Sequence, residues 1–222
     1  MTRLAETEAA RRSYKAPCVI AQALDVLGDR WTLLILRDLM SGLHRYSDIL
    51  ENCQGMSPNV LADRLKRLEA EGMVERHYER ALPPKIDYTL TDKGWAIRPI
   101  LSALIDWGKS YLTETPVDAP STDFTIRTVS AFAFQPDRAE GIEATLVVQI
   151  DDCEGANCWT FRVHDGHLHP RRSADPDPDV RLRTTSAGFF KFLSGQADPA
   201  ECGALDGSPD IARSIQSCFL RT

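Results

Sequence analysis

Residues 57–72, SPNVLADRLKRLEAEG, determine how the first half of this 222-residue chain is expected to fold. The stretch carries the end signals of a helix: Ser57 is a good N-cap, Pro58 fits the first helical position, and Gly72 is a typical terminator. Apolar side chains recur at helical spacing, namely Leu61, Leu65 and Leu68. The segment therefore predicts an amphipathic helix with one core-facing stripe and a polar face directed outward.

Helical patterns also precede this stretch. One helix is expected over residues 19–27, and a central, largely apolar one between Asp29, which can cap it, and Gly42. Ser47 is expected to cap a short helix that runs to about residue 52. Two short helices joined by a glycine-containing turn make a helix-turn-helix, whose second helix has the geometry to enter the major groove of DNA.

A hairpin and a long apolar helix are expected after the stretch. Residues 73–78 and 86–90 have strand character and bracket a proline-containing turn, which predicts a β-hairpin wing. Thr91 and Asp92 are expected to cap one long helix that stays apolar to about Leu112. Because this helix carries more apolar surface than a small domain can cover, we expect it to mediate dimerisation.

The polar face of the 57–72 helix supplies candidate contacts with double-stranded operator DNA. Asn59 suits adenine, Ala62 suits a thymine methyl group, and Lys66 suits guanine or phosphate. Asp63 could accept a hydrogen bond from cytosine or orient a neighbouring arginine. Together with cations near the motif's start and on the wing, the candidate DNA-binding residues are Arg45, Ser57, Asn59, Ala62, Asp63, Lys66, Arg67, Arg80 and Lys85. A solvated surface helix has the same composition, and it is the order of elements around it that favours DNA recognition.

Three distinctive stretches occur in a fixed order: ALDVLGDRWTLLILRDLMSGLHRYSDI (23–49), MSPNVLADRLKRLEAEGMVER (56–76) and PPKIDYTLTDKG (83–94). Together they resemble the HxlR-type transcriptional regulators, a branch of the MarR-like winged helix-turn-helix proteins. The resemblance implies a homodimer that binds a roughly two-fold symmetric operator, with one recognition helix per half-site. Asn59 and Ala62 are this chain's own readout positions, so the operator sequence does not carry over from the family.

Charge is distributed unevenly along the chain. Acidic residues outnumber basic ones by 32 to 26, and the net charge of −6 argues against nucleic-acid binding by the chain as a whole. Residues 1–115, however, carry 16 of each sign, so the excess acid lies entirely in residues 116–222. The seam between them, TETPVDAPSTDFT (113–125), is rich in turn and linker residues. We therefore expect two domains, 1–115 and 116–222.

The second half predicts a small α+β domain. Strand character over residues 124–134, 144–150, 159–164 and 180–185 indicates a small antiparallel sheet. Asp165-Gly166 is a hairpin signal, one helix is expected from Ser186 to Gly195, and a last one over residues 209–220. With the mainly α N-terminal half, the fold class of the whole chain is predicted to be α+β.

The stretch DPDVRLRTTSAGFFKFLSGQADPAECGALDGSPDIARSI (177–215) resembles the SCP2-like sterol-carrier domain. The resemblance implies α+β layers around an apolar tunnel, with a hydrophobic small molecule as ligand. The candidate ligand-binding residues are Phe132, Phe134, Trp159, Phe161, Phe189, Phe192 and Leu193. The alternative is that these side chains fill the core of a ligand-free domain.

The cysteines offer one candidate for redox chemistry. Cys18 precedes the first helix with Lys15 nearby, and several members of the resembled family carry an oxidant-sensing cysteine there. The alternative is an unreactive, half-buried thiol. Cys153 and Cys158 are spaced poorly for a zinc pair, so no metal is expected.

No part of the sequence matches a catalytic motif, so we expect no catalytic residue, no cofactor and no enzyme activity. His164, His167 and His169 with Asp165 are the one cluster considered, and histidines in a hairpin are more often surface residues. Without a signal or membrane-spanning pattern, a cytoplasmic protein with no membrane partner is expected.

Three functions are compatible with the sequence. The chain is a ligand-modulated DNA-binding regulator, a constitutive or redox-switched regulator whose second domain is a scaffold, or an enzyme or lipid carrier whose winged helix binds protein. Salt-dependent binding to DNA separates the first two from the third.

Overall fold

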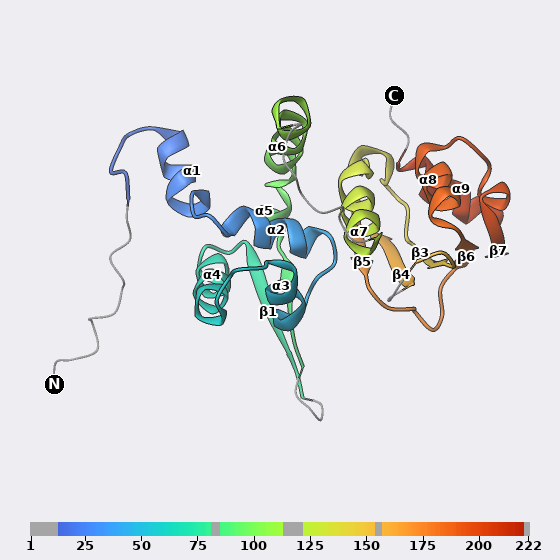
Figure 1. Cartoon of the computed structure of the whole chain (residues 1–222), viewed down its shortest axis with the longest axis horizontal. Coiled ribbons are helices and arrows are strands. Elements are labelled where there is room, and N and C mark those ends of the chain that lie inside the picture. Colours follow the sequence, from blue (N-terminus) through green and yellow to red (C-terminus); the bar gives the residue numbers. More distant parts are fainter. Residues whose placement is uncertain (1–12, 81–84, 113–121, 154–156, 220–222) are drawn as a thin grey trace.

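The computed structural model describes residues 13–80, 85–112, 122–153 and 157–219. The predicted α+β class is confirmed: a helical region with a β-hairpin is followed by a sheet with its own helices (Figure 1). One cluster of buried apolar side chains lies in the N-terminal half and another in the C-terminal half. In the described ranges, no helix has the length and apolar character that crossing a bilayer requires.

The N-terminal half follows its sequence signals closely. Its elements are α1 (Val19–Leu27), α2 (Thr32–Met40), α3 (Tyr46–Asn52), α4 (Pro58–Ala70), β1 (Val74–Glu79), β2 (Lys85–Leu90), α5 (Asp92–Trp95) and α6 (Arg98–Tyr111). The predicted stripe of α4 is buried, because Leu61, Leu65 and Leu68 are at most 2% exposed. These leucines share a hydrophobic cluster with Ile35 and Leu36 of α2, so the opposite face of α4 is turned to solvent.

The predicted start of the short helix and the predicted long apolar helix need correction. The short helix begins at Tyr46, and Ser47 lies inside it rather than at its N-cap. The long apolar helix is divided between Trp95 and Arg98, because Pro99 lies in the first turn of α6. A proline ring clashes with the carbonyl four residues earlier, here that of Trp95, so one continuous helix cannot form.

The C-terminal half is a sheet covered by helices. Its elements are α7 (Thr122–Ala133), η1 (Pro136–Arg138), β3 (Ala144–Ile150), β4 (Cys158–His164), β5 (His167–Arg171), β6 (Val180–Thr184), α8 (Ser186–Ser194), η2 (Pro199–Glu201), β7 (Gly203–Gly207) and α9 (Pro209–Ser217). The described strands lie in the order β5-β4-β3-β6-β7. The predicted hairpin between β4 and β5 is present, with Asp165 and Gly166 in the left-handed region at its turn.

Three predictions for this half need correction. Residues 124–134 are not a strand, because most of them belong to α7; Ile126, Ser130 and Phe134 are buried at a helical spacing of four. The sheet is mixed rather than antiparallel, since β3 and β6 run parallel. The last helix ends at Ser217, and residue 220 of its predicted range lies outside the described residues.

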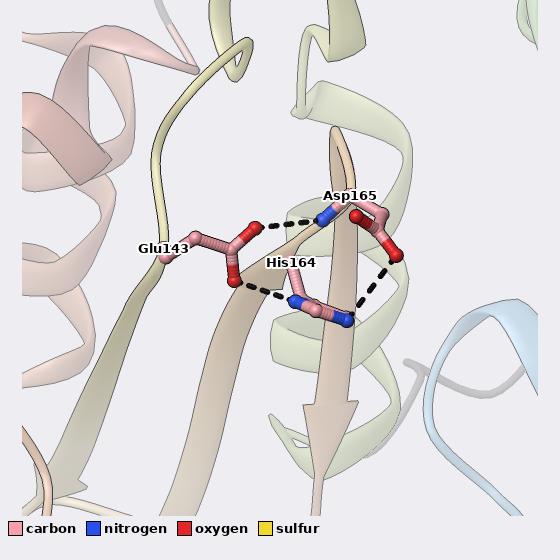
Figure 2. A group of neighbouring side chains, drawn as sticks. All are labelled: Glu143, His164 and Asp165. Atoms are coloured by element: carbon pink, nitrogen blue, oxygen red, sulfur yellow. Dashed lines mark hydrogen bonds and ion pairs between the residues drawn. The ribbon is translucent and has the colours of Figure 1, made fainter.

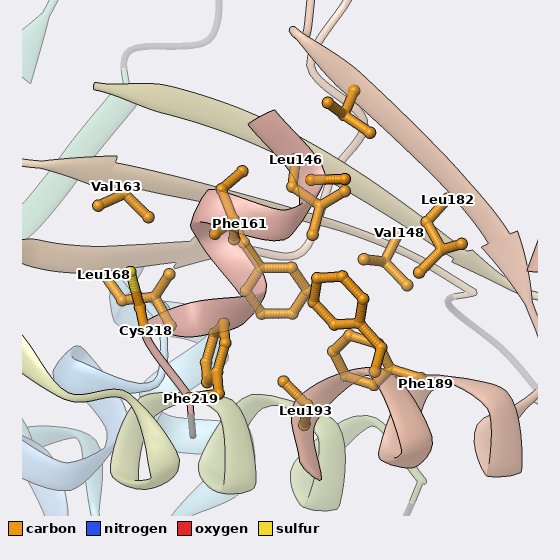
Figure 3. Packing of buried hydrophobic residues seen from close by; sticks show 14 of the residues in the cluster. Leu146, Val148, Phe161, Val163, Leu168, Leu182, Phe189, Leu193, Cys218 and Phe219 are labelled. Carbon is orange, nitrogen blue, oxygen red and sulfur yellow. The ribbon is translucent and has the colours of Figure 1, made fainter. Parts of the chain in front are cut away.

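Aromatic rings fill the space between this sheet and its helices. Figure 3 shows Phe161 of the sheet facing Phe189 of α8, and the two rings stack with centroids 5.6 Å apart. Phe189 stacks in turn on Phe192 at 6.2 Å, and Phe219 meets the edge of Phe134 at 5.5 Å. These rings form the continuous core of the C-terminal half.

Candidate nucleic-acid interface

Hydrogen bonds fix the start of α4 relative to α3. The hydroxyl of Tyr46 donates to the carbonyl oxygen of Pro58 at 2.5 Å, which links the first turns of the two helices. Ser57 caps α4 as predicted, because its Oγ accepts from the Val60 N–H at 3.4 Å. The turn between the helices passes through Gly55 at φ +87, a conformation that glycine adopts without steric cost. The two helices and this turn form the predicted helix-turn-helix.

A buried carboxylate holds the other end of α3. Asp38 of α2 is fully buried, and its carboxylate accepts from Arg37 Nε at 2.8 Å, from Asn52 Nδ2 at 2.9 Å and from Cys53 Sγ at 3.2 Å. Burial and the neighbouring Asp38 raise the pKa of Cys53 to about 12, so this cysteine stays a thiol and a donor. Sequence reasoning missed this anchor, although an aspartate inside the apolar run ILRDLM (35–40) was its signal.

Every predicted DNA contact is an exposed residue. The set consists of Ser57, Asn59, Ala62, Asp63, Lys66 and Arg67 around α4, with Arg45, Arg80 and Lys85 near α3 and on the hairpin. Figure 1 shows the hairpin of β1 and β2 projecting away from the helices. Residues 81–84 of the predicted wing turn lie outside the described residues.

Ion pairs distinguish the members of this set. Asp63 lies 3.6 Å from Arg64, whose guanidinium also pairs with Asp29 at 3.1 Å. This geometry fits the second role considered for Asp63, the orientation of a neighbouring arginine. The backbone N–H of Trp31 donates to Asp29 at 3.0 Å, so Asp29 supports the start of α2 without being its N-cap. Arg67 lines a small pocket beside α1 and α2, which places it on the flank of α4.

Cations near the hairpin have acidic neighbours of their own. Lys85 lies 3.8 Å from Glu79 across the two strands, and Arg45 lies 3.8 Å from Asp87 of β2. Sequence reasoning did not include Arg76, an exposed cation on β1. Its signal was the alternation of charges along VERHYE, the sequence of that strand.

Large apolar side chains are exposed on α1 and α6. On α1 they are Val19, Ile20 and Leu24, and on α6 they are Ile100, Leu104, Trp107 and Tyr111. Their exposed fractions run from 44% to 79%. The two sets are called the apolar faces of α1 and α6 below.

The predicted ligand-binding residues are distributed over both cores. Phe134, Trp159, Phe161, Phe189, Phe192 and Leu193 are at most 5% exposed and belong to the core of the C-terminal half. Phe132 instead packs against the N-terminal cluster. Cys18, the predicted redox candidate, is exposed at the N-cap position of α1.

A cluster of exposed side chains lies at the hairpin of β4 and β5. Figure 2 shows the His164 ring between two carboxylates: Nδ1 lies 2.5 Å from Glu143, and Nε2 lies 3.2 Å from Asp165. The hydrogen bond to Glu143 raises the pKa of His164, and the same bond lowers the pKa of Glu143. These three residues could approach a cation, but each imidazole nitrogen already faces its own carboxylate. The arrangement is therefore best described as an ion-paired imidazolium.

The other two histidines of this hairpin, His167 and His169, are half-buried. His167 stacks on Trp95 of the N-terminal half with ring centroids 5.0 Å apart, and His169 meets the same indole edge-on at 5.8 Å. Burial and the neighbouring His167 lower the pKa of His169 to about 4, which keeps its ring neutral. The hairpin thus belongs to the contact between the two halves.

Comparison with known proteins gives matches for each half of the chain. The HxlR-like helix-turn-helix family matches residues 26–116, and the SCP-2 sterol transfer family matches residues 130–203. The chain is 39% identical over 97 residues to the uncharacterized HTH-type transcriptional regulator YvaP of Bacillus subtilis, covering 44% of this chain and 90% of that protein. It is 38% identical over 89 residues to the HTH-type transcriptional regulator YodB of the same organism, covering 40% and 80%. The solved reduced form of YodB covers 46% of this chain and all of that one, with 36% identity and a TM-score of 0.39.

Proposed function

Because the chain belongs to the HxlR-like helix-turn-helix family, we propose that it regulates transcription by binding double-stranded operator DNA as a homodimer. The proposal rests on the two faces of α4. Three leucines are buried along one face, and the opposite face presents exposed polar side chains. Its relatives are named as HTH-type transcriptional regulators, which supports a role in binding rather than in catalysis.

Base reading is assigned to the centre of the exposed face of α4. The carboxamide of Asn59 suits adenine, the Ala62 methyl suits thymine, and Lys66 suits guanine. Asp63 has an arginine neighbour at 3.6 Å, and we assign it to orienting that arginine. We assign Ser57, at the N-terminus of α4, to a contact with a backbone phosphate.

Phosphate contacts are assigned to the flanking cations. These are Arg67 on the side of α4, Arg45 before α3, and Arg80 and Lys85 on the hairpin. Contacts of this kind orient the protein on the duplex and carry the salt dependence of binding, whereas base contacts carry sequence preference. The net charge of the chain does not oppose this assignment, because residues 1–115 have no excess acid.

The occupant proposed for the apolar faces of α1 and α6 is a second copy of the chain. Each contains several large apolar side chains that are 44% to 79% exposed, and contiguous apolar surface on a helix commonly marks a protein contact. Trp107 and Tyr111 lie on one side of α6, with ring centroids 5.8 Å apart. A homodimer would place two copies of α4 on successive major grooves.

We propose that residues 1–115 and 116–222 form two domains. The second of them, the C-terminal half, has two candidate roles. One is a scaffold whose aromatic side chains form its own core, supported by the stacking of Phe161, Phe189 and Phe192. The other is a site for a hydrophobic small molecule, supported by the match to the SCP-2 sterol transfer family. Titration with a fluorescent fatty acid separates them, because saturable binding at one site per chain supports the second role only.

Selection of duplexes from a random-sequence library by the full-length chain tests the DNA-binding proposal. We expect an enriched, approximately palindromic sequence whose half-sites lie one helical turn, about 34–36 Å, apart. Trp107→Glu is expected to shift the chain toward monomer in sedimentation. The duplexes that this variant selects are expected no longer to be palindromic. Recovery of no preferred sequence at low salt would contradict the proposal.

A further inference from the structure

The two halves meet along α7 and β5, and several contacts there are buried. Figure 1 shows α7 between the helix-turn-helix and the rest of the sheet domain. The Arg98 guanidinium of α6 donates to the carbonyl oxygens of Ala131 and Phe132, both at 3.2 Å, and also to that of Phe134. The backbone of the two halves also approaches closely where Gly42 faces the carbonyl oxygen of Pro170.

One chain of polar contacts crosses this boundary. It starts in the core of the sheet, where the indole Nε1–H of Trp159 donates to Asp123 Oδ1 at 2.9 Å. The other oxygen of Asp123 accepts from Arg127 Nε at 2.9 Å. Arg127 then reaches out of its own half and donates to Ser41 Oγ, just after α2, at 2.8 Å. These four residues are called the polar relay below.

Burial makes the geometry of this relay restrictive. Trp159, Arg127 and Ser41 are at most 2% exposed, and the side chain of Asp123 is 17% exposed. A buried guanidinium must keep its acceptors, because solvent cannot replace them. Arg127 can therefore keep both of its hydrogen bonds, to Asp123 and to Ser41, only while α7 and α2 hold their present relative position. A shift of Trp159 away from Asp123 would disturb that position.

The relay continues to the helix-turn-helix through Asp38. Ser41 Oγ donates to the carbonyl oxygen of Asp38 at 3.0 Å. The carboxylate of the same residue holds Asn52 and Cys53, the last residue of α3 and its C-cap. From there the chain turns directly into α4. A continuous set of hydrogen bonds thus joins the core of the C-terminal half to the helices assigned to DNA.

We propose that Asp123 and Arg127 are positioning residues for DNA binding, which transmit the packing around Trp159 to the orientation of α3 and α4. This inference rests on the proposed function, because it concerns binding to DNA. It adds a route by which the C-terminal half controls the affinity for operator DNA. Asp123 and Arg127 lie outside the surface assigned to DNA, so any effect of their substitution on affinity is indirect.

Affinity measurements on the full chain test this proposal. Operator binding is measured by fluorescence anisotropy, using a duplex selected by the wild-type chain, for Trp159→Phe, Arg127→Met and the double variant. Each single substitution is expected to weaken binding by roughly two- to thirtyfold. The affinity of the double variant is expected to equal that of the single variant that binds less tightly, because both substitutions break the same relay. Unchanged affinities, or effects that multiply in the double variant, would overturn the proposal.

Two controls separate the relay from general loss of stability. Arg183→Met removes an arginine of the same sheet that is 64% exposed and pairs with Asp151, outside the relay. Leu182→Val reduces the same buried core as Trp159→Phe but leaves the three hydrogen bonds of the relay in place. Both controls are expected to leave operator affinity unchanged. A loss of affinity in Leu182→Val equal to that in Trp159→Phe would show that core packing alone is responsible.

Hydrogen exchange of the DNA-free chain keeps this proposal distinct from the function on which it rests. We expect faster exchange of the Asn52 and Cys53 amides in Trp159→Phe and Arg127→Met, and wild-type rates in Arg183→Met. If the wild-type chain selects no duplex, the proposed function fails, and exchange alone decides whether the relay holds α3. Wild-type exchange rates in both relay variants would contradict the relay itself.

Discussion

The carboxylate of Asp38 accepts a hydrogen bond from the side-chain amide of Asn52 at 2.9 Å, and so ties the end of α3 to α2. Replacing Asp38 with alanine leaves the donors of Arg37, Asn52 and Cys53 without their acceptor. We expect the free energy of unfolding, measured in urea, to fall by about 2–4 kcal/mol. Asp151→Ala, which breaks an exposed pair with Arg183, should lower it by less than about 1 kcal/mol. Equal losses would contradict the anchoring role of Asp38.

The contact between Gly42 and Pro170 should tolerate no side chain. A Cβ atom at Gly42 would lie 2.0 Å from the Pro170 carbonyl oxygen, whereas one at Gly141 would meet nothing within 4 Å. Both glycines have positive φ, +90 and +74, so the backbone penalty of alanine is common to the two. Gly42→Ala is therefore expected to destabilise the chain by about 1–3 kcal/mol more than Gly141→Ala. Thermal unfolding of the two variants checks this difference, and similar midpoints would rule out close contact of the halves there.

Acid should weaken the fold through His169. The folded-state pKa of this residue, about 4, lies below its ordinary value of about 6.5, so the unfolded chain binds a proton that the folded chain lacks. Stability from the neutral ring is complete above about pH 6.5 and is lost as the pH falls toward 4. After allowance for solvent screening, we expect a loss of about 1–2 kcal/mol. Urea unfolding as a function of pH measures it.

A variant isolates the contribution of His169 from those of its neighbours. Burial also lowers the pKa of His44 and of His167. His164 behaves in the opposite way, because its hydrogen bond to Glu143 raises its pKa. Its contribution to stability is therefore present below pH 6.5 and is lost as the pH rises through its folded-state pKa. His169→Phe keeps an aromatic ring against Trp95 and cannot titrate. Its stability should fall less steeply between pH 6.5 and 4 than that of the wild type, and an unchanged slope would exclude His169 as the source.

Thiol reagents should separate Cys18 from Cys53. Cys18 is exposed, whereas Cys53 is buried with its pKa raised to about 12, and the thiolate is the reactive form. Brief treatment with iodoacetamide followed by mass spectrometry should modify Cys18 and leave Cys53 intact. Modification of Cys53 in the folded chain would contradict its environment. The redox alternative then depends on Cys18→Ser, which should abolish any oxidant-dependent change in operator affinity.

Local signals predicted most of the elements, because helix ends depend on nearby residues. Ser57, Pro58 and Gly72 delimited α4 correctly, and Asp165-Gly166 identified the β4–β5 hairpin. The error over residues 124–134 has the same local origin, because phenylalanine, threonine, isoleucine and valine favour strands. In the structure, Ile126 packs in the C-terminal cluster and Phe132 against the N-terminal one, and this packing on both sides favours the helix.

Contacts between distant residues could not be predicted in this way. The aspartate at position 38 was visible as an anomaly in an apolar helix, yet its partner Asn52 depends on how α3 folds back. Arg127 and Ser41 are 86 residues apart, and nothing near either residue indicates the other. The relay is therefore a property of the assembled fold, whereas the polar face of α4 was readable from sequence because helical periodicity alone separates it from the leucine stripe.

Base reading by α4 is tested by the binding of Asn59→Ala to the selected duplex. The affinities of three proteins are measured at several salt concentrations: the wild type, Asn59→Ala and the matched control Arg183→Ala. Each is measured on the selected duplex and on a duplex changed at the base pair assigned to Asn59. Asn59→Ala is expected to lose about 1–3 kcal/mol of binding free energy on the selected duplex, to keep the salt dependence of the wild type, and no longer to distinguish the two duplexes. Arg183→Ala is expected to bind like the wild type. Full retention of sequence preference by Asn59→Ala would contradict the assignment of α4 as the reading helix.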